Sequence, residues 1–198
     1  MTHRPPFVGA LLPRTSSSSS ESAVPTRIPT EWLVLLGLGL LAVVLRASVN
    51  LPLKLPGHHG LEWMAILMFA RVISDQPRAA TVVAGSAAMF SWLPVWGFHA
   101  GGMEWGFLLS GLVVDGCWRA LRARATFVLA LLAAAAHGIK PLFKYGLMLA
   151  TGAHIGSLGS FGSIEAGLAY PLLCHLAYGA VGGVVGVMAG KALRDARS

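Results

Sequence analysis

The sequence predicts an all-α membrane protein, a polytopic bundle of six transmembrane helices with both termini in the cytoplasm. Its 198 residues are 55% hydrophobic and only 12% charged, whereas a soluble domain has about a quarter of its residues charged. The mean hydropathy is +0.67. The charges stand in short clusters between long apolar runs, which argues against a disordered chain and an ordinary soluble enzyme.

Residues 1–30 differ in composition from the rest of the chain. They contain five prolines, three arginines and the serine run Ser16–Ser20, and their apolar residues do not recur with a helical or strand period. We expect a disordered basic tail, because a long polar stretch before the first apolar run disfavours a signal peptide. The membrane domain is expected over residues 31–194, and residues 195–198 form a short cytoplasmic tail.

Six apolar runs approach the roughly 20 helical residues that cross a hydrocarbon core. We expect a helix over each of them: Trp32–Val49, Leu61–Ile73, Ala79–Phe98, Trp105–Trp118, Ala125–Ala150 and Gly167–Gly190. The first contains Arg46, which can reach the interface with its side chain. The second is short and spans only if its terminal charges reach both surfaces. The third contains Pro94, which a membrane helix tolerates, and the fifth is expected to break around Gly138 and Pro141.

The distribution of basic residues supports six spans. With the tail inside, eleven Lys and Arg residues lie inside and four lie outside. The inside set is Arg4, Arg14, Arg27, Arg71, Arg78, Arg119, Arg122, Arg124, Lys191, Arg194 and Arg197; the outside set is Arg46, Lys54, Lys140 and Lys144. The bias disappears if one helix is added or removed. The predicted location is the cell (inner) membrane.

A cationic stripe is predicted on the fifth helix. His137, Lys140 and Lys144 are spaced i, i+3, i+7, which places them on one face. Cationic side chains in an apolar segment are costly in lipid, so we expect them to face a cavity and bind a carboxylate or phosphate. The alternative is that the two lysines only extend to the outer interface.

The sixth helix carries a second polar face, formed by His175, Tyr178 and Gly182. We hypothesise that a small anionic molecule binds between the fifth and sixth helices, where the lysines neutralise it and His175 and Tyr178 orient it. Trp96 or Trp105 would stack on it. The alternative is ordinary hydrogen bonding between helices.

A cluster of metal-binding residue types precedes the second helix. His58, His59 and Glu62, with His99 and His154 from other loops, could ligate a divalent transition metal. Histidines at the membrane interface that bind no metal are the alternative.

Glycines recur every fourth residue in the sixth helix, at Gly182, Gly186 and Gly190. Such rows allow a second helix to approach closely. The partner could be the first or third helix of the same chain, or a separate membrane subunit that docks in this groove.

The sequence predicts no catalytic residues and no cofactor. It lacks the phosphate-binding and Cys-x-x-Cys motifs, and the loop serines of residues 156–163 have no context that would activate them. Asp115 and Arg119, four residues apart, are expected to form a structural ion pair. The basic residues that give the +7 net charge flank the apolar runs instead of forming a patch, so we expect no nucleic acid partner.

Over residues 31–194 the chain resembles the substrate-binding S component of energy-coupling factor transporters. The resemblance rests on six helices, the first outer loop Asn50–Gly60, a lid-like stretch Thr151–Ala166, and the polar residues of the fifth and sixth helices. It implies a non-enzymatic subunit that captures a vitamin or a metal ion outside and works with a transmembrane coupling subunit and ATPases. A structural or assembly protein of the membrane without a ligand is the rival interpretation.

Overall fold

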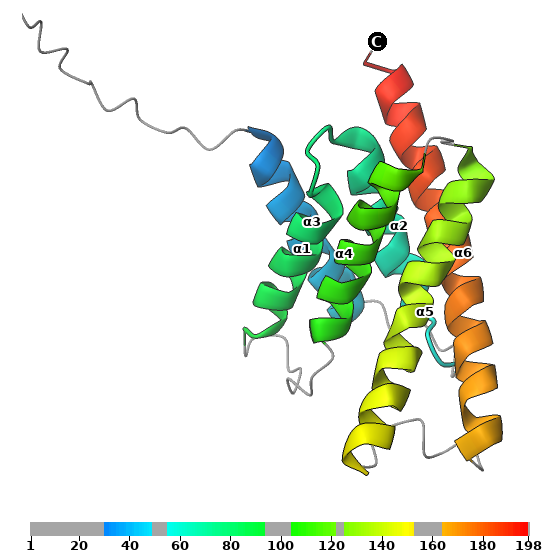
Figure 1. Cartoon of the computed structure of the whole chain (residues 1–198). Coiled ribbons are helices and arrows are strands. Elements are labelled where there is room, and N and C mark those ends of the chain that lie inside the picture. Colours follow the sequence, from blue (N-terminus) through cyan, green and yellow to red (C-terminus); the bar gives the residue numbers. More distant parts are fainter. Residues whose placement is uncertain (1–29, 49–54, 94–103, 122–124, 153–163, 198) are drawn as a thin grey trace, which may run out of the picture.

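The computed structural model describes residues 30–48, 55–93, 104–121, 125–152 and 164–197. These residues form six helices and no strand, which confirms the all-α prediction for this part of the chain (Figure 1). The helices are α1 Thr30–Ser48, α2 Gly60–Ile73, α3 Ala79–Ser91, α4 Glu104–Ala120, α5 Thr126–Thr151 and α6 Ile164–Asp195. Residues 1–29 of the predicted tail 1–30 and the continuation of the third run over residues 94–98 lie outside the described residues, and Thr30 begins α1.

Three of these helices are long and apolar enough to cross a membrane. They are α1, α5 and residues Leu168–Asp195 of α6. By contrast, α2 has 14 residues and α3 has 13, which at 1.5 Å per residue gives each about 20 Å. By length and composition, the described part of the chain therefore has the helices of a membrane protein.

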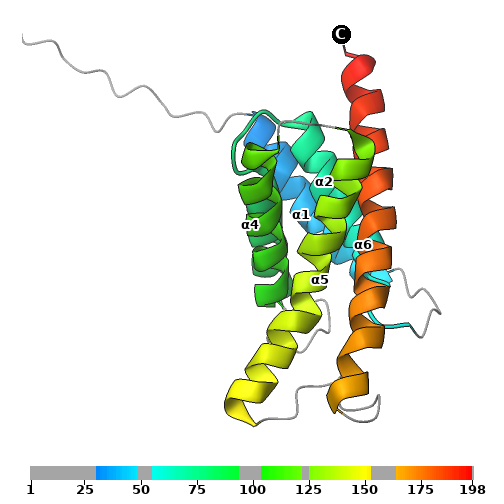
Figure 2. The same cartoon turned by 45° about the vertical axis from the view of Figure 1, so that its right-hand side comes forward.

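Helix α2 lies at the centre of the bundle. It contacts each of the other five helices, most extensively α6, which packs between α2 and α5. On the other side, α3 packs against α1 and α4, and α4 also packs against α5 (Figures 1 and 2). The start of α1 and the end of α6 lie at the same end of the bundle, which we name the terminal end; the opposite one is the far end.

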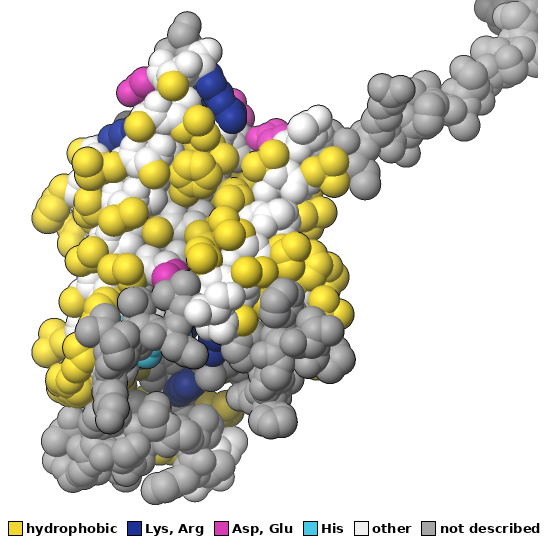
Figure 3. Space-filling model, turned by 180° about the vertical axis from the view of Figure 1, so that it is seen from behind, with side chains coloured by type: hydrophobic (Ala, Val, Ile, Leu, Met, Phe, Trp, Pro, Cys, Tyr) yellow, Lys and Arg dark blue, Asp and Glu magenta, His cyan; other side chains and the backbone are white. Residues whose placement is uncertain are grey.

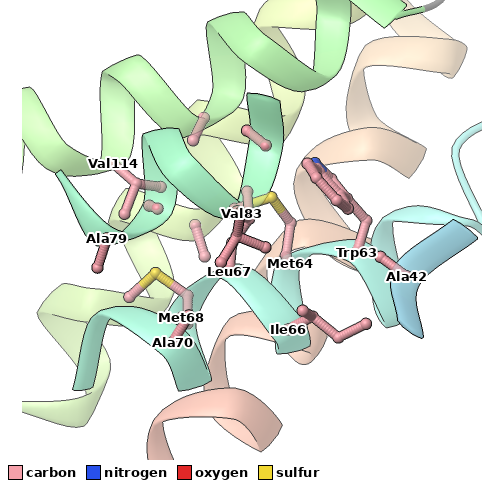
Figure 4. Packing of buried hydrophobic residues seen from close by; sticks show 14 of the residues in the cluster. Ala42, Trp63, Met64, Ile66, Leu67, Met68, Ala70, Ala79, Val83 and Val114 are labelled. Carbon is pink, nitrogen blue, oxygen red and sulfur yellow. The ribbon is translucent and has the colours of Figure 1, made fainter. Parts of the chain in front are cut away.

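The core is built around α2. Met64, Leu67 and Met68 are fully buried, and Figure 4 shows them gathered with Val83 of α3 and Val114 of α4. Lipid is about as apolar as these side chains, so close van der Waals contact holds such a core together inside a membrane.

The outer surface of the bundle is apolar. Many large hydrophobic side chains are exposed, among them Leu33, Leu41, Met89, Leu131 and Val185. In Figure 3 hydrophobic side chains cover much of the face shown, and acidic and basic side chains gather at its upper end, with a few further charged side chains in the middle and lower half. A band of this kind is suited to lipid.

The glycine row of α6 faces α2 of the same chain. A Cβ on Gly186 would lie 2.1 Å from the carbonyl oxygen of Ala65, and one on Gly182 would lie 2.4 Å from that of Leu61. A Cβ on Gly190 would lie 2.8 Å from the Val72 side chain. The prediction that this row could dock a separate subunit is wrong, because α2 already occupies it.

A second pair of glycines lets α6 approach α5. A Cβ on Gly179 would lie 2.9 Å from the carbonyl oxygen of Ala133, and one on Gly183 would lie 2.4 Å from the Ala133 side chain. Small residues on two sides of α6 therefore allow it to pack closely against both neighbours, a common device where helices associate in membranes. The packing partners are α2 and α5, rather than the predicted first or third helix.

The predicted break in the fifth helix is also wrong. Helix α5 continues through Pro141, which is buried. Gly138 lies against α6, where a Cβ would be 2.8 Å from a methyl group of Leu176. Membrane helices tolerate proline when neighbouring groups compensate for the lost backbone hydrogen bond. Gly138 allows α5 to pack closely against α6 and does not interrupt the helix.

A buried carboxylate holds three helices together at the terminal end. Asp115 of α4 accepts the backbone N–H of Ala80 at 3.2 Å and that of Thr81 at 2.7 Å, so it caps the start of α3. The Nε of Arg71 in α2 lies 3.8 Å from the same carboxylate. Both charged side chains are buried. Breaking such a pair leaves an uncompensated charge inside the protein.

The neighbouring polar contacts fix the turn between α2 and α3. Arg71 donates to the carbonyl oxygens of Ser74 and Gln76, and Glu31 of α1 accepts from the Ser74 hydroxyl at 2.5 Å and the Gln76 amide at 3.0 Å. Arg119 donates to the Pro77 carbonyl at 3.3 Å. The partner of Asp115 is thus Arg71, and not the predicted Arg119.

Replacing Asp115→Ala should destabilise the protein by about 3 kcal/mol or more, because it removes a helix cap and strands a buried arginine. The control is Asp75→Ala, whose partner Arg194 lies at 3.5 Å and whose side chain is 90% exposed. This control should leave stability nearly unchanged. Unfolding in mixed detergent, followed by helical circular dichroism, measures both. Equal losses would contradict the assignment.

Candidate functional site

A pocket opens at the far end of the bundle among α1, α2, α3 and α4. The space within it, including the part continuous with solvent, is about 330 Å³. Its lining residues are Ala42, Val43, Arg46, His59, Glu62, Trp63, Ala87, Ser91 and Phe107. It combines apolar walls with a few polar side chains, the usual composition of a small-molecule site.

Two aromatic rings and one cation, Arg46, line this pocket, and Lys140 lies against the same rings without being among the lining residues. The rings of Trp63 and Phe107 pack edge to face with centroids 4.4 Å apart, and both residues are buried. The Lys140 ammonium of α5 lies 4.0 Å from the Phe107 centroid and 5.6 Å from that of Trp63. The Arg46 guanidinium carbon lies 5.3 Å from the Phe107 centroid. Each cation over a ring is stabilised by about 0.5–2 kcal/mol, less than the cost of burying a bare charge.

Four buried polar atoms at this end have no hydrogen-bond partner within the described part of the chain. They are Nδ1 of His59, Oε1 of Glu62, Nε1 of Trp63 and Nδ1 of His137. Such an atom costs about 1–3 kcal/mol when it stays unpaired. Three of these four residues line the pocket, although the unpaired atoms themselves expose almost no surface.

His59 enters the pocket as a neutral side chain. Burial, together with the neighbouring His58, lowers the pKa of His59 to about 4. At neutral pH it therefore offers one donor and one acceptor, without adding a third positive charge. Glu62 is the only carboxylate among the residues that line the pocket.

Beside the pocket, the turn before α2 rests on two stacked histidines. The rings of His137 and His175 are 4.8 Å apart and inclined by 27°. His137 donates from Nε2 to the Gly57 carbonyl at 3.2 Å, and His175 donates from Nδ1 to the Pro171 carbonyl at 2.7 Å. Gly57 has a φ of +79°, and a Cβ there would lie 2.6 Å from Nδ1 of His175. The turn needs glycine for both reasons.

The structure brings together only part of the predicted anion site. Lys140 lies against the Phe107 and Trp63 rings without being among the lining residues, whereas His137 and His175 support the turn. Lys144 and Tyr178 are half-buried and are not among the lining residues. Trp96 lies outside the described residues, and the side chain of Trp105 is not described.

The predicted metal site is not formed by His58, His59 and Glu62. No group of three His, Cys, Asp or Glu side chains could hold a metal ion in the described ranges. His58 bonds through Nδ1 to the Leu55 carbonyl at 2.7 Å, so its ring is engaged in the turn. His99 and His154 lie outside the described residues.

Sequence reasoning missed Arg46, Trp63 and Phe107 as site residues. Arg46 was expected only to reach the interface with its side chain. A charged residue inside the first apolar run was the available signal. Phe107 carries no signal of its own in the sequence.

Comparison with known proteins adds no relative: no family model, no curated protein and no solved structure matches the chain.

Replacing Gly57→Ala should lower the thermal stability, because the new methyl group meets both a forbidden φ and the His175 ring. Gly152→Ala is the matched control, with a φ of +65° and no atom within 4 Å. The control should lose about 1–2 kcal/mol from its backbone alone, and Gly57→Ala should lose more. Combining Gly57→Ala with His175→Ala should recover part of the difference in detergent melting curves. Identical losses in the two single variants would mean that the turn does not rest on His175.

Proposed function

We propose that the protein is the substrate-binding subunit of a membrane importer for a small anionic, vitamin-like molecule. It would capture the molecule in the far-end pocket and depend on a separate coupling subunit and ATPases for transport. The carrying observation is the pair of cations, Arg46 and Lys140, beside the Phe107 ring in an otherwise apolar bundle. An anionic group would supply a counter-charge for Lys140 in this apolar surrounding.

We further propose that all six helices span the membrane, with both termini cytoplasmic. An even number of described helices places the start of α1 and the end of α6 at one end. That end also holds Arg78, Arg119, Lys191 and Arg194, as the positive-inside rule requires of a cytoplasmic face. The short α2 suits this arrangement because the other helices surround it. The pocket would then open outward.

The topology is tested by single-cysteine labelling in intact cells, in a chain whose Cys117 and Cys174 are replaced by alanine. Thr151→Cys at the far end should react with a membrane-impermeant maleimide. Arg197→Cys at the terminal end should react only after the cells are permeabilised. The reverse pattern would overturn the orientation, and labelling of both positions from outside would overturn the even number of spans.

The anion site is tested with Lys140→Met, which keeps the stem and removes the charge. Purified protein is screened by thermal shift against small aromatic carboxylates and phosphates, and hits are measured by calorimetry. Loss of a charged partner should weaken binding about 10- to 100-fold. The control Lys144→Met removes the half-buried lysine one helical turn further along α5 and should change affinity much less. If no anion binds, or if Lys140→Met binds as tightly as the parent protein, the structural or assembly role becomes the better explanation.

A further inference from the structure

The contact between the turn before α2 and helix α5 depends on neutral histidine rings. His137 is 2% exposed and donates from Nε2 to the Gly57 carbonyl oxygen at 3.2 Å. Its other ring nitrogen, Nδ1, is therefore the acceptor of the neutral ring, and it is buried without a hydrogen-bond partner in the described part of the chain. Nδ1 of His59, at the end of the turn, is also buried and lacks a partner among the described residues.

A proton added to either ring would be costly in this position. It would leave Nδ1 as a buried donor with no acceptor, and it would place a positive charge in an apolar surrounding. For His59 this cost is expressed in the pKa, which burial and the neighbouring His58 lower to about 4. The docked turn therefore favours the neutral form of both rings.

The surrounding charges add to this cost because they are positive. The groups whose charges act on His137 are Lys140 of the same helix, His175 of α6 and His59 of the turn. The groups whose charges act on His59 are His58, Arg46 and Lys140. Glu62 is the only carboxylate at the far end whose side chain the structure describes, and it belongs to neither set. A protonated ring would therefore be repelled by its described neighbours.

We propose that residues 55–59 form a proton-sensitive latch, which stays docked on α5 and α6 while His59 and His137 are neutral and is released when these rings take up protons. A histidine in contact with water takes up a proton below a pH of about 6.5, so the docked turn is favoured above this pH and weakens below it. One proton taken up on release raises the ratio of released to docked turns about 30-fold between pH 7.5 and pH 5. Because His59 lines the pocket, release of the turn would also open the pocket.

Hydrogen exchange on the full chain in detergent, read by mass spectrometry, measures the release of the latch. The amides of Gly60 and Leu61 donate to the carbonyl oxygens of Gly57 and His58 at 2.8 and 3.1 Å, so a peptide over residues 55–63 reports the opening of the turn. Its exchange is divided by that of the unfolded chain at the same pH, which cancels the pH dependence of the exchange chemistry. The protection of this peptide should fall about 30-fold or more between pH 7.5 and pH 5. The turn between α2 and α3 at the terminal end should keep its protection.

The two rings are tested by combining His59→Gln with His137→Gln, because glutamine keeps an amide donor for the Gly57 carbonyl and takes up no proton in this range. Protection of the turn in this double variant should change less than about 3-fold between the two pH values. The matched control is His58→Gln in the same turn. His58 bonds through Nδ1 to the Leu55 carbonyl at 2.7 Å, and a protonated ring still donates this bond, so the control should keep the response of the parent protein.

The latch is wrong if the corrected protection of the turn does not depend on pH in the parent protein, or if the double variant responds as strongly as the parent. It is also wrong if the turn between α2 and α3 loses protection to the same extent, since acid then loosens the whole bundle. If the double variant already lacks protection at pH 7.5, His137→Gln alone takes its place and should remove at least about 10-fold of the response. The measurement follows the turn and not ligand binding, so its outcome is independent of the proposed function.

Discussion

The close approach of α6 to α2 is the constraint on which the rest of the structure depends. At Gly186 the backbones come so near that a methyl group would lie 2.1 Å from the Ala65 carbonyl oxygen. This contact fixes α2 in the middle of the bundle, where it touches every other helix. Since the first turn of α2 carries Glu62 and Trp63, the same packing that buries Met64 and Leu67 also delivers these two side chains to the pocket.

The two ends of the bundle treat buried charge in opposite ways. At the terminal end Asp115 is satisfied by Arg71 and by the first backbone N–H groups of α3, as a structural site requires. At the far end Glu62 keeps an unpaired oxygen, and Lys140 lies over aromatic rings. Polar groups left unpaired in an interior are costly, so they are informative where they cluster. The carboxylate at the terminal end is therefore tied into the fold, whereas the one at the far end keeps an unpaired oxygen.

The sequence predicted the helices well and their neighbours poorly. Apolar runs and charge spacing depend on local composition, so all six helices were found, and Lys140 was recognised as a cation that must face something. Which helix packs against a glycine row depends on how distant segments of the chain pack together, and the periodicity of the sequence carries no information about this. The contact between α2 and Gly186 was therefore not predicted. For the same reason Pro141 was expected to break a helix that its neighbours keep continuous. Arg46 was explained locally, without the ring of Phe107 that it meets.

The length of α2 explains why the pocket is recessed. At 1.5 Å per residue α2 is about 21 Å long and α5 about 39 Å. Their terminal ends are held close to α6 by hydrogen bonds, from Arg194 to the Val72 carbonyl and from Lys191 to Thr126. The excess length of α5 therefore projects at the far end (Figures 1 and 2). The first turn of α2, which carries Glu62 and Trp63 of the pocket lining, is therefore set back from the tips of α5 and α6.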